Sequence, residues 1–208
     1  MKMIFKSKYG HYIFRIVLYG PALSSKATIL KVLFKQIRLP IINSFRMLEF
    51  PPEHGGIFLD FCIAPGQERH RSLRKRILKD VDSIIFVANS DPNALKENIH
   101  SIRELHSFLE YYSYDVPLIV ALNKRDLPNA VLVDELVRNL RIEGLYPIFE
   151  TIAVRGVGVK RVFREAIRLA VLYRIFPDVC RREIRLLIQK TTQRLVGKVF
   201  YSSKQHTS

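Results

Sequence analysis

Short apolar runs of strand length alternate with segments of helical periodicity along most of the chain. Because a strand that is apolar throughout must be covered on both faces, this alternation indicates a mostly parallel sheet with helical crossovers on each side. The sequence therefore predicts an α/β fold in three layers, with a six-stranded sheet. The expected strands cover residues 11–19, 44–51, 57–63, 83–88, 116–122 and 146–151, and the expected helices about 26–37, 68–79, 91–111, 131–142 and 159–176.

The second and third expected strands are joined by a tight turn instead of a helix. Residues 53–56 read Glu-His-Gly-Gly, which favours a hairpin and hence one antiparallel edge. The carboxyl ends of the parallel strands should share one rim, which is where open sheets of this kind bind ligands. We expect Gly20, Gly66, Asn123 and Ala153 to meet there.

A break at Pro177-Asp178 divides the chain into residues 1–176 and a C-terminal segment, 177–208. With Asp178 as its N-cap, that segment predicts a basic amphipathic helix of roughly twenty residues. The whole chain has 208 residues, which is enough for one α/β domain and such a helix. Neither a membrane span nor a signal peptide is predicted, so we expect a cytoplasmic protein, with peripheral membrane association as an open alternative.

The net charge of +15 is concentrated in two places. Residues 160–208 hold twelve basic and three acidic residues, and residues 66–80 hold six basic and two acidic ones. Such clustering favours an acidic protein, an anionic membrane surface or, less strongly, a nucleic acid as partner. For the C-terminal helix, packing on the domain with a solvated basic face is the competing interpretation.

The first strand is followed by a glycine-started loop and then a helix, which is the layout of a phosphate-binding loop. Gly20 and Lys26 stand at the expected spacing, and Lys26 would bind a β-phosphate. A second loop begins with Pro65-Gly66-Gln67 after the third strand. The candidate phosphate-binding residues are Gly20, Ala22, Leu23, Ser24, Ser25, Lys26, Ala27, Thr28 and Gly66.

Asn123-Lys124-Arg125-Asp126, at the end of a buried strand, is the most specific signal in the sequence. The Asp126 carboxylate could accept two hydrogen bonds from the N1 and N2 donors of guanine, a pair that adenine lacks. The Lys124 stem could cover the purine face, and Asn123 could tie this loop to the phosphate loop. A polar turn at the start of a helix is the alternative interpretation.

Together these motifs resemble those of the Ras-like small GTPases, a P-loop NTPase fold. Gly-Pro-x-Leu in the first loop and Pro-Gly-Gln in the second are most similar to the MglA-type gliding-motility and polarity GTPases and their archaeal relatives. The resemblance covers about residues 11–175 and implies GTP or GDP as ligand. It places Ala153 and Val154 at the guanine, with the Ala153 amide near O6, and implies a roadblock-type activator or effector as partner.

Several departures from the family pattern affect one corner of the expected site. Ser25 replaces a glycine, Ala27 replaces the hydroxyl residue that ligates Mg²⁺, and Ile63 replaces an acidic or hydroxyl residue. Ala22 replaces a glycine beside the catalytic glutamine. Between Lys35 and Gly56 there is no threonine for the first switch. No metal ligand is therefore assigned, and an intact Mg²⁺ site is not expected.

Three interpretations follow from this balance of matches and departures. The first is a guanine-nucleotide-binding switch protein with weak or absent intrinsic hydrolysis, in which Gln67 is the catalytic candidate and Arg69 or Arg71 could add charge in cis. The second is a pseudo-GTPase that acts as a scaffold or subunit through its basic surfaces. The third is a basic module for nucleic acid or acidic lipid.

Overall fold

The computed structural model describes residues 12–37, 47–49 and 57–203. These residues form a six-stranded sheet in the order β2-β3-β1-β4-β5-β6, in which β2 runs antiparallel to β3 and the other neighbours are parallel. The predicted α/β fold and the antiparallel edge are confirmed. The strands are β1 (Tyr12–Tyr19), β2 (Met47–Glu49), β3 (Ile57–Ile63), β4 (Ser83–Asn89), β5 (Leu118–Asn123) and β6 (Ile148–Glu150).

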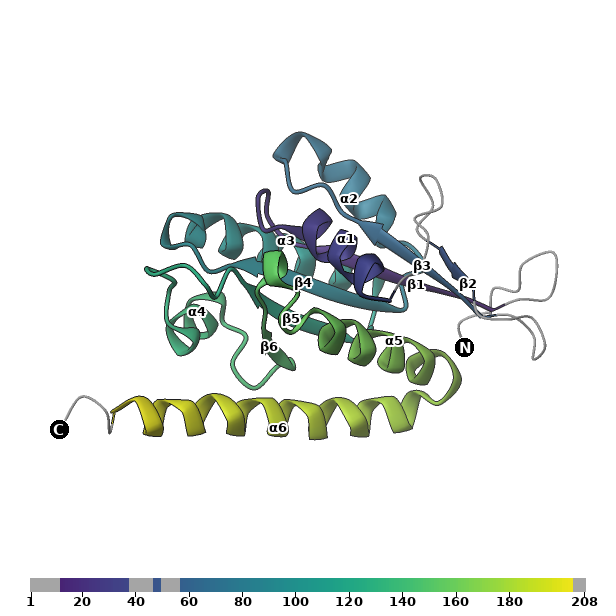
Figure 1. Ribbon diagram of the computed structural model, residues 1–208. Helices are drawn as coiled ribbons and strands as arrows, with labels where there is room; N and C mark the ends of the chain where they lie inside the picture. The colour runs from purple at the N-terminus through teal and green to yellow at the C-terminus, as the bar shows by residue number, and fades with distance from the viewer. Residues whose placement is uncertain (1–11, 38–46, 50–56, 204–208) are drawn as a thin grey trace.

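Helices cover both faces of the sheet (Figure 1). On one face lie α1 (Lys26–Ile37) and α5 (Val159–Ile175), and on the other lie α2 (Arg71–Ile77), α3 (Leu95–Tyr112) and α4 (Val133–Leu140). Short 3-10 turns, η2 (Glu68–His70), η3 (Pro92–Ala94) and η4 (Ala153–Arg155), follow three strands. Helix α4 is shorter than expected because Leu132 is extended and Arg141 adopts a left-handed conformation with φ 55°.

Each face of the sheet has its own apolar core, which explains the uninterrupted apolar runs. In β1, alternate side chains such as Ile16 and Leu18 join the core under α1 and α5, whereas Val17 and Tyr19 join the core under α2, α3 and α4. This period of two is what a strand buried on both sides requires. The central strands therefore hold their carboxyl-terminal loops on a rigid base.

The C-terminal helix α6 (Pro177–Ser203) is longer than the sequence predicts, with 27 residues. It begins at Pro177, so Asp178 lies in its first turn and accepts a hydrogen bond from Arg181 instead of capping the helix. Figure 1 shows α6 running past α5 and β6 on the side away from α2. None of the helices in the described part combines the length and apolar character that a bilayer crossing needs.

The apolar side of α6 faces the domain over residues 180–191. Cys180 and Leu187 belong to the core shared with α5, and Ile184 packs against it. Thr191 is 3% exposed, and its Oγ1 accepts a hydrogen bond from the backbone N–H of Ile148 at 3.3 Å. Helix α6 therefore covers the edge strand β6, while Arg181, Arg182, Arg185 and Lys190 stay exposed.

Candidate guanine-nucleotide site

The loops that follow β1, β3, β5 and β6 meet at one rim of the sheet, as the sequence predicts. Gly66 lies against the backbone of Pro21 and Ala22, which brings the second loop onto the first. Asn123 bonds both the first loop and the loop after β6. The expected hairpin turn 53–56 and most of the first-switch segment lie outside the described residues.

The phosphate loop, residues 20–26, turns through three positions with positive φ. Gly20 has φ 137°, and a Cβ there would lie 2.4 Å from the carbonyl oxygen of Val87, so this position requires glycine. Leu23 and Ser25 have φ 58° and 70°. Ser25 therefore keeps the left-handed conformation of the glycine that it replaces, at a cost of about 1–2 kcal/mol.

The Lys26 side chain is folded back along the phosphate loop. Its Nζ donates hydrogen bonds to the carbonyl oxygens of Gly20 at 2.7 Å and Pro21 at 2.6 Å, and lies 3.4 Å from Ser24 Oγ. Burial of the amine, with a smaller contribution from the nearby Arg74 cation, lowers the pKa of Lys26 to about 8. The loop thus holds one desolvated cation, which an anionic ligand would stabilise in its charged form.

The residues at the expected metal corner do not fit Mg²⁺. Ala27, in the first turn of α1, exposes a methyl group where an oxygen ligand is needed. Ile63 ends β3 with another apolar side chain. Thr28 is one residue further along α1 than Ala27, which turns it about 100° around the helix axis. The described residues thus supply no oxygen ligand at the position of Ala27, and no step is assigned to a metal.

The Asn123 side chain connects three loops and is fully buried. Its Nδ2 donates to the carbonyl oxygen of Ser24 at 3.0 Å, and its Oδ1 accepts from Thr151 Oγ1 at 3.1 Å and from the Ala153 amide at 3.0 Å. All of these polar groups are therefore satisfied inside the protein. The expected tie between the Asn123 loop and the phosphate loop is present, and Thr151 is an additional member that the sequence did not single out.

The remaining guanine candidates surround this connection. Lys124 follows β5 with φ 63° and is half-buried, whereas Asp126 is exposed. Ala153 is buried and begins η4, and Val154 is 70% exposed. Asp126 and Val154 thus lie at the surface, near the buried Asn123 and Ala153 in sequence, where a ligand could reach them.

The second loop is packed directly on the phosphate loop. A Cβ on Gly66 would lie 2.2 Å from the Ala22 amide nitrogen, so the two backbones touch. Gln67 is exposed and extended, and precedes η2. Its side chain lines a cavity of about 550 Å³ between the phosphate loop, α2 and α3. The catalytic candidate is thereby placed beside Pro21 and Ala22.

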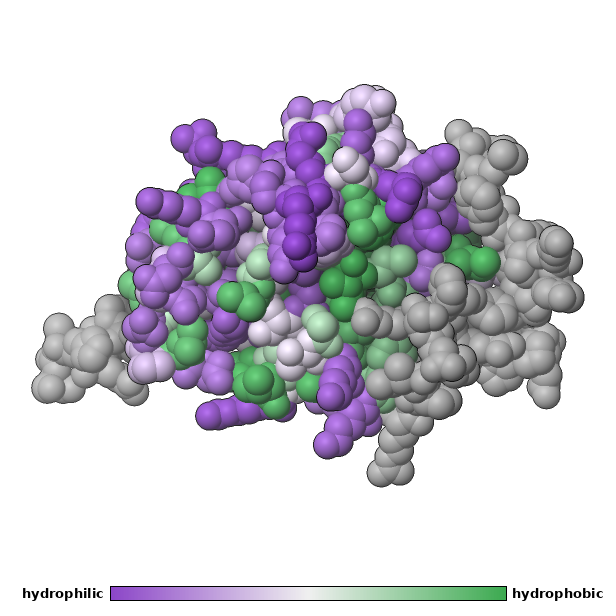
Figure 2. All heavy atoms as spheres, turned by 90° about the horizontal axis from the view of Figure 1, so that it is seen from above, coloured by the Kyte–Doolittle hydropathy of each residue, from purple (hydrophilic) through white to green (hydrophobic). Residues whose placement is uncertain are grey.

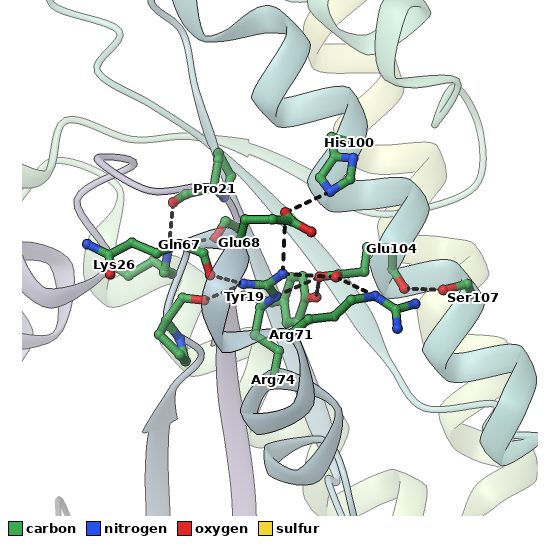
Figure 3. A network of polar contacts seen from close by, with 12 residues as sticks. Tyr19, Pro21, Lys26, Gln67, Glu68, Arg71, Arg74, His100, Glu104 and Ser107 are labelled. Atoms are coloured by element: carbon green, nitrogen blue, oxygen red, sulfur yellow. Dashed lines mark hydrogen bonds and ion pairs between the residues drawn. The ribbon is translucent and has the colours of Figure 1, made fainter.

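A buried polar network behind the second loop was missed by sequence reasoning (Figure 3). Arg74 is 3% exposed and bonds Glu104 with Nε at 2.6 Å and Nη2 at 2.9 Å. Tyr19 Oη donates to Glu104 Oε2 at 2.5 Å. Arg74 lies at helical spacing from the buried Leu78, which could have marked it as an inward-facing residue.

The network decides the ionisation of Glu104. Burial alone would raise the pKa of this carboxyl, but hydrogen bonds from Arg74 and Tyr19 outweigh burial and lower it. Burial and the bond to Glu104 raise the pKa of Tyr19. Arg71, which could add charge in cis, pairs with Glu104 at 3.2 Å and lies over the Phe108 ring.

Glu68, His100 and Glu104 gather their ligand atoms within 4.8 Å of one another beside the cavity. Both Glu104 oxygens, however, already bind guanidinium groups, and Arg74 lies 3.8 Å from Glu68. A cation there would face two arginines at close range. Figure 2, which shows the molecule from above, shows a mostly hydrophilic face with a narrower hydrophobic strip crossing it.

Comparisons with known proteins show the family of the chain. The ADP-ribosylation factor family matches residues 1–168. The chain belongs to this family of Ras-like small GTPases. It is 32% identical over 165 residues to mutual gliding-motility protein MglA of Myxococcus xanthus, an alignment that covers 70% of this chain and 84% of that protein. The MglA-type resemblance inferred from the motifs is thereby confirmed.

Two further similarities concern part of the sequence and the fold. ADP-ribosylation factor-like protein 4C of Homo sapiens is 34% identical over 93 residues, which cover 44% of this chain and 47% of that protein. The solved Arl6 BBS3 small GTPase from Trypanosoma brucei, with the bound nucleotide analogue GppNp, aligns with a TM-score of 0.60 and 22% identity. That alignment covers 76% of this chain and 98% of the other, and it shows the fold of this small GTPase.

Proposed function

We propose that this small GTPase binds GDP and GTP at the rim and hydrolyses GTP slowly or not at all without a partner. The observation that carries the proposal is the buried Asn123 side chain, which joins the loops expected to bind guanine to the loop expected to bind phosphate. Such a connection between separate loops is useful where one ligand spans them. Family membership supports the same ligand class.

The phosphate end of the ligand would rest on residues 20–28, at the N-terminus of α1. Backbone amides at a helix N-terminus favour an anion. Lys26 adds a buried amine that is already oriented by two carbonyl oxygens. Phosphate oxygens would restore the charge that burial disfavours, so Lys26 should contribute strongly to affinity.

The base would be selected by Asp126, with Lys124 and Val154 covering the purine faces and the Ala153 amide near O6. The Ala153 amide is fixed by Asn123, so its distance from the base would not vary with the exposed parts of the loop. Asp126 is free to approach a ligand because it is exposed. This assignment is a prediction, and comparing the affinities for nucleotides with different bases tests it.

Weak hydrolysis is proposed because the positive charge needed at the terminal phosphate is incomplete. Phosphoryl transfer depends on cations and positioned donors for most of its acceleration. Ala27 offers no metal ligand, and Arg71 and Arg74 both bind Glu104. Gln67 remains beside Ala22, where a partner could complete the site.

A second candidate function is a pseudo-GTPase scaffold. It is favoured by the exposed arginines of α6, because its apolar face already packs on the domain and leaves only charge for a partner. Attraction to an acidic protein or an anionic bilayer would then be electrostatic and sensitive to salt. A roadblock-type activator and a cytoplasmic location stay predictions from the sequence and its resemblance.

The test begins with the nucleotide that co-purifies with the protein, followed by titration of GDP with and without Mg²⁺. We expect tight GDP binding that Mg²⁺ changes little. Asp126→Asn should weaken GDP binding by about a hundredfold or more, the loss of two charge-assisted hydrogen bonds, and should gain xanthosine diphosphate. Asp134→Asn, which changes an exposed aspartate on α4, is the matched control. Equal GDP affinity in both variants would contradict the assignment.

A further inference from the structure

We propose that Tyr19, Glu104 and Arg74 form a clamp that keeps the second loop docked on the phosphate loop whichever guanine nucleotide is bound. This inference rests on the proposed function for its ligand. It assigns Arg74 and Glu104 as positioning residues for Gly66 and Gln67. The clamp connects three elements, β1, α2 and α3, in one buried network (Figure 3).

Arg74 binds the backbone of the second loop through hydrogen bonds. Its Nη1 donates to the carbonyl oxygen of Pro65 at 3.2 Å and to that of Gln67 at 2.5 Å. These carbonyls belong to the residues before and after Gly66, so a single guanidinium bonds the Pro65–Gly66 and Gln67–Glu68 peptide units. The backbone of Gly66 is thereby pressed against Ala22.

Glu104 anchors Arg74 in turn. Glu104 binds Arg74 through both carboxylate oxygens and receives a third bond from Tyr19. Tyr19 belongs to the central strand β1 and is fully buried. Since the sheet holds Tyr19, and Tyr19 holds Glu104, the guanidinium has one favoured position. Releasing it would leave the buried Glu104 carboxylate with the exposed Arg71 as its remaining cation, which is unfavourable because Arg74 is the buried member of the pair.

The terminal phosphate of GTP could move the second loop only if it stabilised the undocked loop strongly enough. To invert a loop preference from 99:1 to 1:99, a ligand must favour the other state by about 10⁴-fold. A terminal phosphate commonly gains such leverage through a metal that ties it to the loops. Ala27 removes an expected ligand of that metal, so the exchange of GDP for GTP should not displace the clamped loop.

The experiment uses a reporter, because the chain contains no tryptophan. Ser72→Trp, at an exposed position on α2, reports on the second loop by fluorescence. Emission is recorded with GDP and with a non-hydrolysable GTP analogue, and amide hydrogen exchange of residues 65–77 is measured in parallel. Clamp variants are Glu104→Gln and Tyr19→Phe, each in the reporter background. Arg76→Gln, which changes an exposed arginine on α2, is the control.

We expect the same emission with both nucleotides in the unmodified clamp and in the Arg76→Gln control. In Glu104→Gln the emission should depend on the nucleotide, and exchange of residues 65–77 should accelerate roughly tenfold or more, as the loss of a charge-assisted hydrogen bond implies. Tyr19→Phe should change the emission and the hydrogen exchange in the same direction. Because it keeps the aromatic ring in the core, it still tests the clamp if Glu104→Gln does not fold.

Two results would overturn the clamp. One is emission that differs between GDP and the GTP analogue while the clamp is intact. The other is unchanged exchange of residues 65–77 in Tyr19→Phe and in every clamp variant that folds. Failure of the proposed function gives a different result. If the protein binds neither nucleotide, hydrogen exchange of residues 65–77 in the nucleotide-free clamp variants still tests the clamp.

Discussion

At the scale of single residues, Lys26 ties the site to pH. Burial lowers its pKa from 10.5 to about 8, so between these values the unfolded chain holds a proton that the folded chain has released. The contribution of Lys26 to the stability of the nucleotide-free protein therefore rises with pH across that window. A diphosphate restores the charge, so binding GDP near pH 9 should take up about one proton, and near pH 7 almost none.

Calorimetric titration of GDP in two buffers of different ionisation enthalpy measures this proton uptake. Lys26→Met should abolish it and weaken GDP binding. Lys31→Met, at an exposed position on α1, should leave both unchanged. Proton uptake that is the same at pH 7 and pH 9 would show that the Lys26 amine is charged throughout.

Gly66 supplies a second prediction at this scale, because it is the point of contact between the two loops. In Gly66→Ala the new Cβ would meet the Ala22 amide nitrogen at 2.2 Å, so the backbones must separate. We expect a loss of about 1–3 kcal/mol in the free energy of unfolding. Hydrogen exchange should accelerate in residues 65–77.

The control for this substitution is Gly144→Ala. Gly144 has φ 66° and open space around the position of a Cβ, so strain alone should cost about 1 kcal/mol. It should leave exchange of residues 65–77 unchanged. Equal exchange in the two variants would mean that Gly66 does not set the position of the second loop.

At the scale of elements, α6 acts as the cover of a sheet edge. An exposed edge strand offers unpaired backbone groups to other chains, and the β6 edge is met by Thr191. Thr191→Val keeps the shape of the side chain but removes the acceptor of the Ile148 amide. The unfolding free energy should fall by about 1–3 kcal/mol, measured by urea denaturation, because a buried donor loses its partner.

Thr192→Val provides the matched control for α6, since Thr192 is the neighbouring residue and is exposed. Its unfolding free energy should change by less than about 0.5 kcal/mol. If the two valine variants unfold at the same urea concentration, the bond from Ile148 contributes nothing to holding α6 in place.

At the scale of the whole molecule, the fold was predictable because short apolar runs of strand length alternate with segments of helical periodicity. Asn123 was predictable for the same reason, as its motif directly follows a buried strand. The clamp was not predictable, because Arg74 lies within a run of mostly exposed cations. The other two members of the clamp, Tyr19 and Glu104, are 55 and 30 positions away from it in the sequence. Only the folding of β1, α2 and α3 onto one another brings these side chains together.

Net charge gives the last prediction, because +15 on a chain of 208 residues repels itself in the compact state. Buried pairs such as Arg174 with Asp82 are poorly screened, whereas repulsion among exposed cations falls as salt rises. Raising KCl from about 20 to about 300 mM should therefore raise the melting temperature by a few degrees. The double variant Arg182→Glu, Arg185→Glu lowers the net charge by four at exposed positions and should show a smaller rise. A melting temperature that falls with salt would mean that exposed ion pairs outweigh the repulsion.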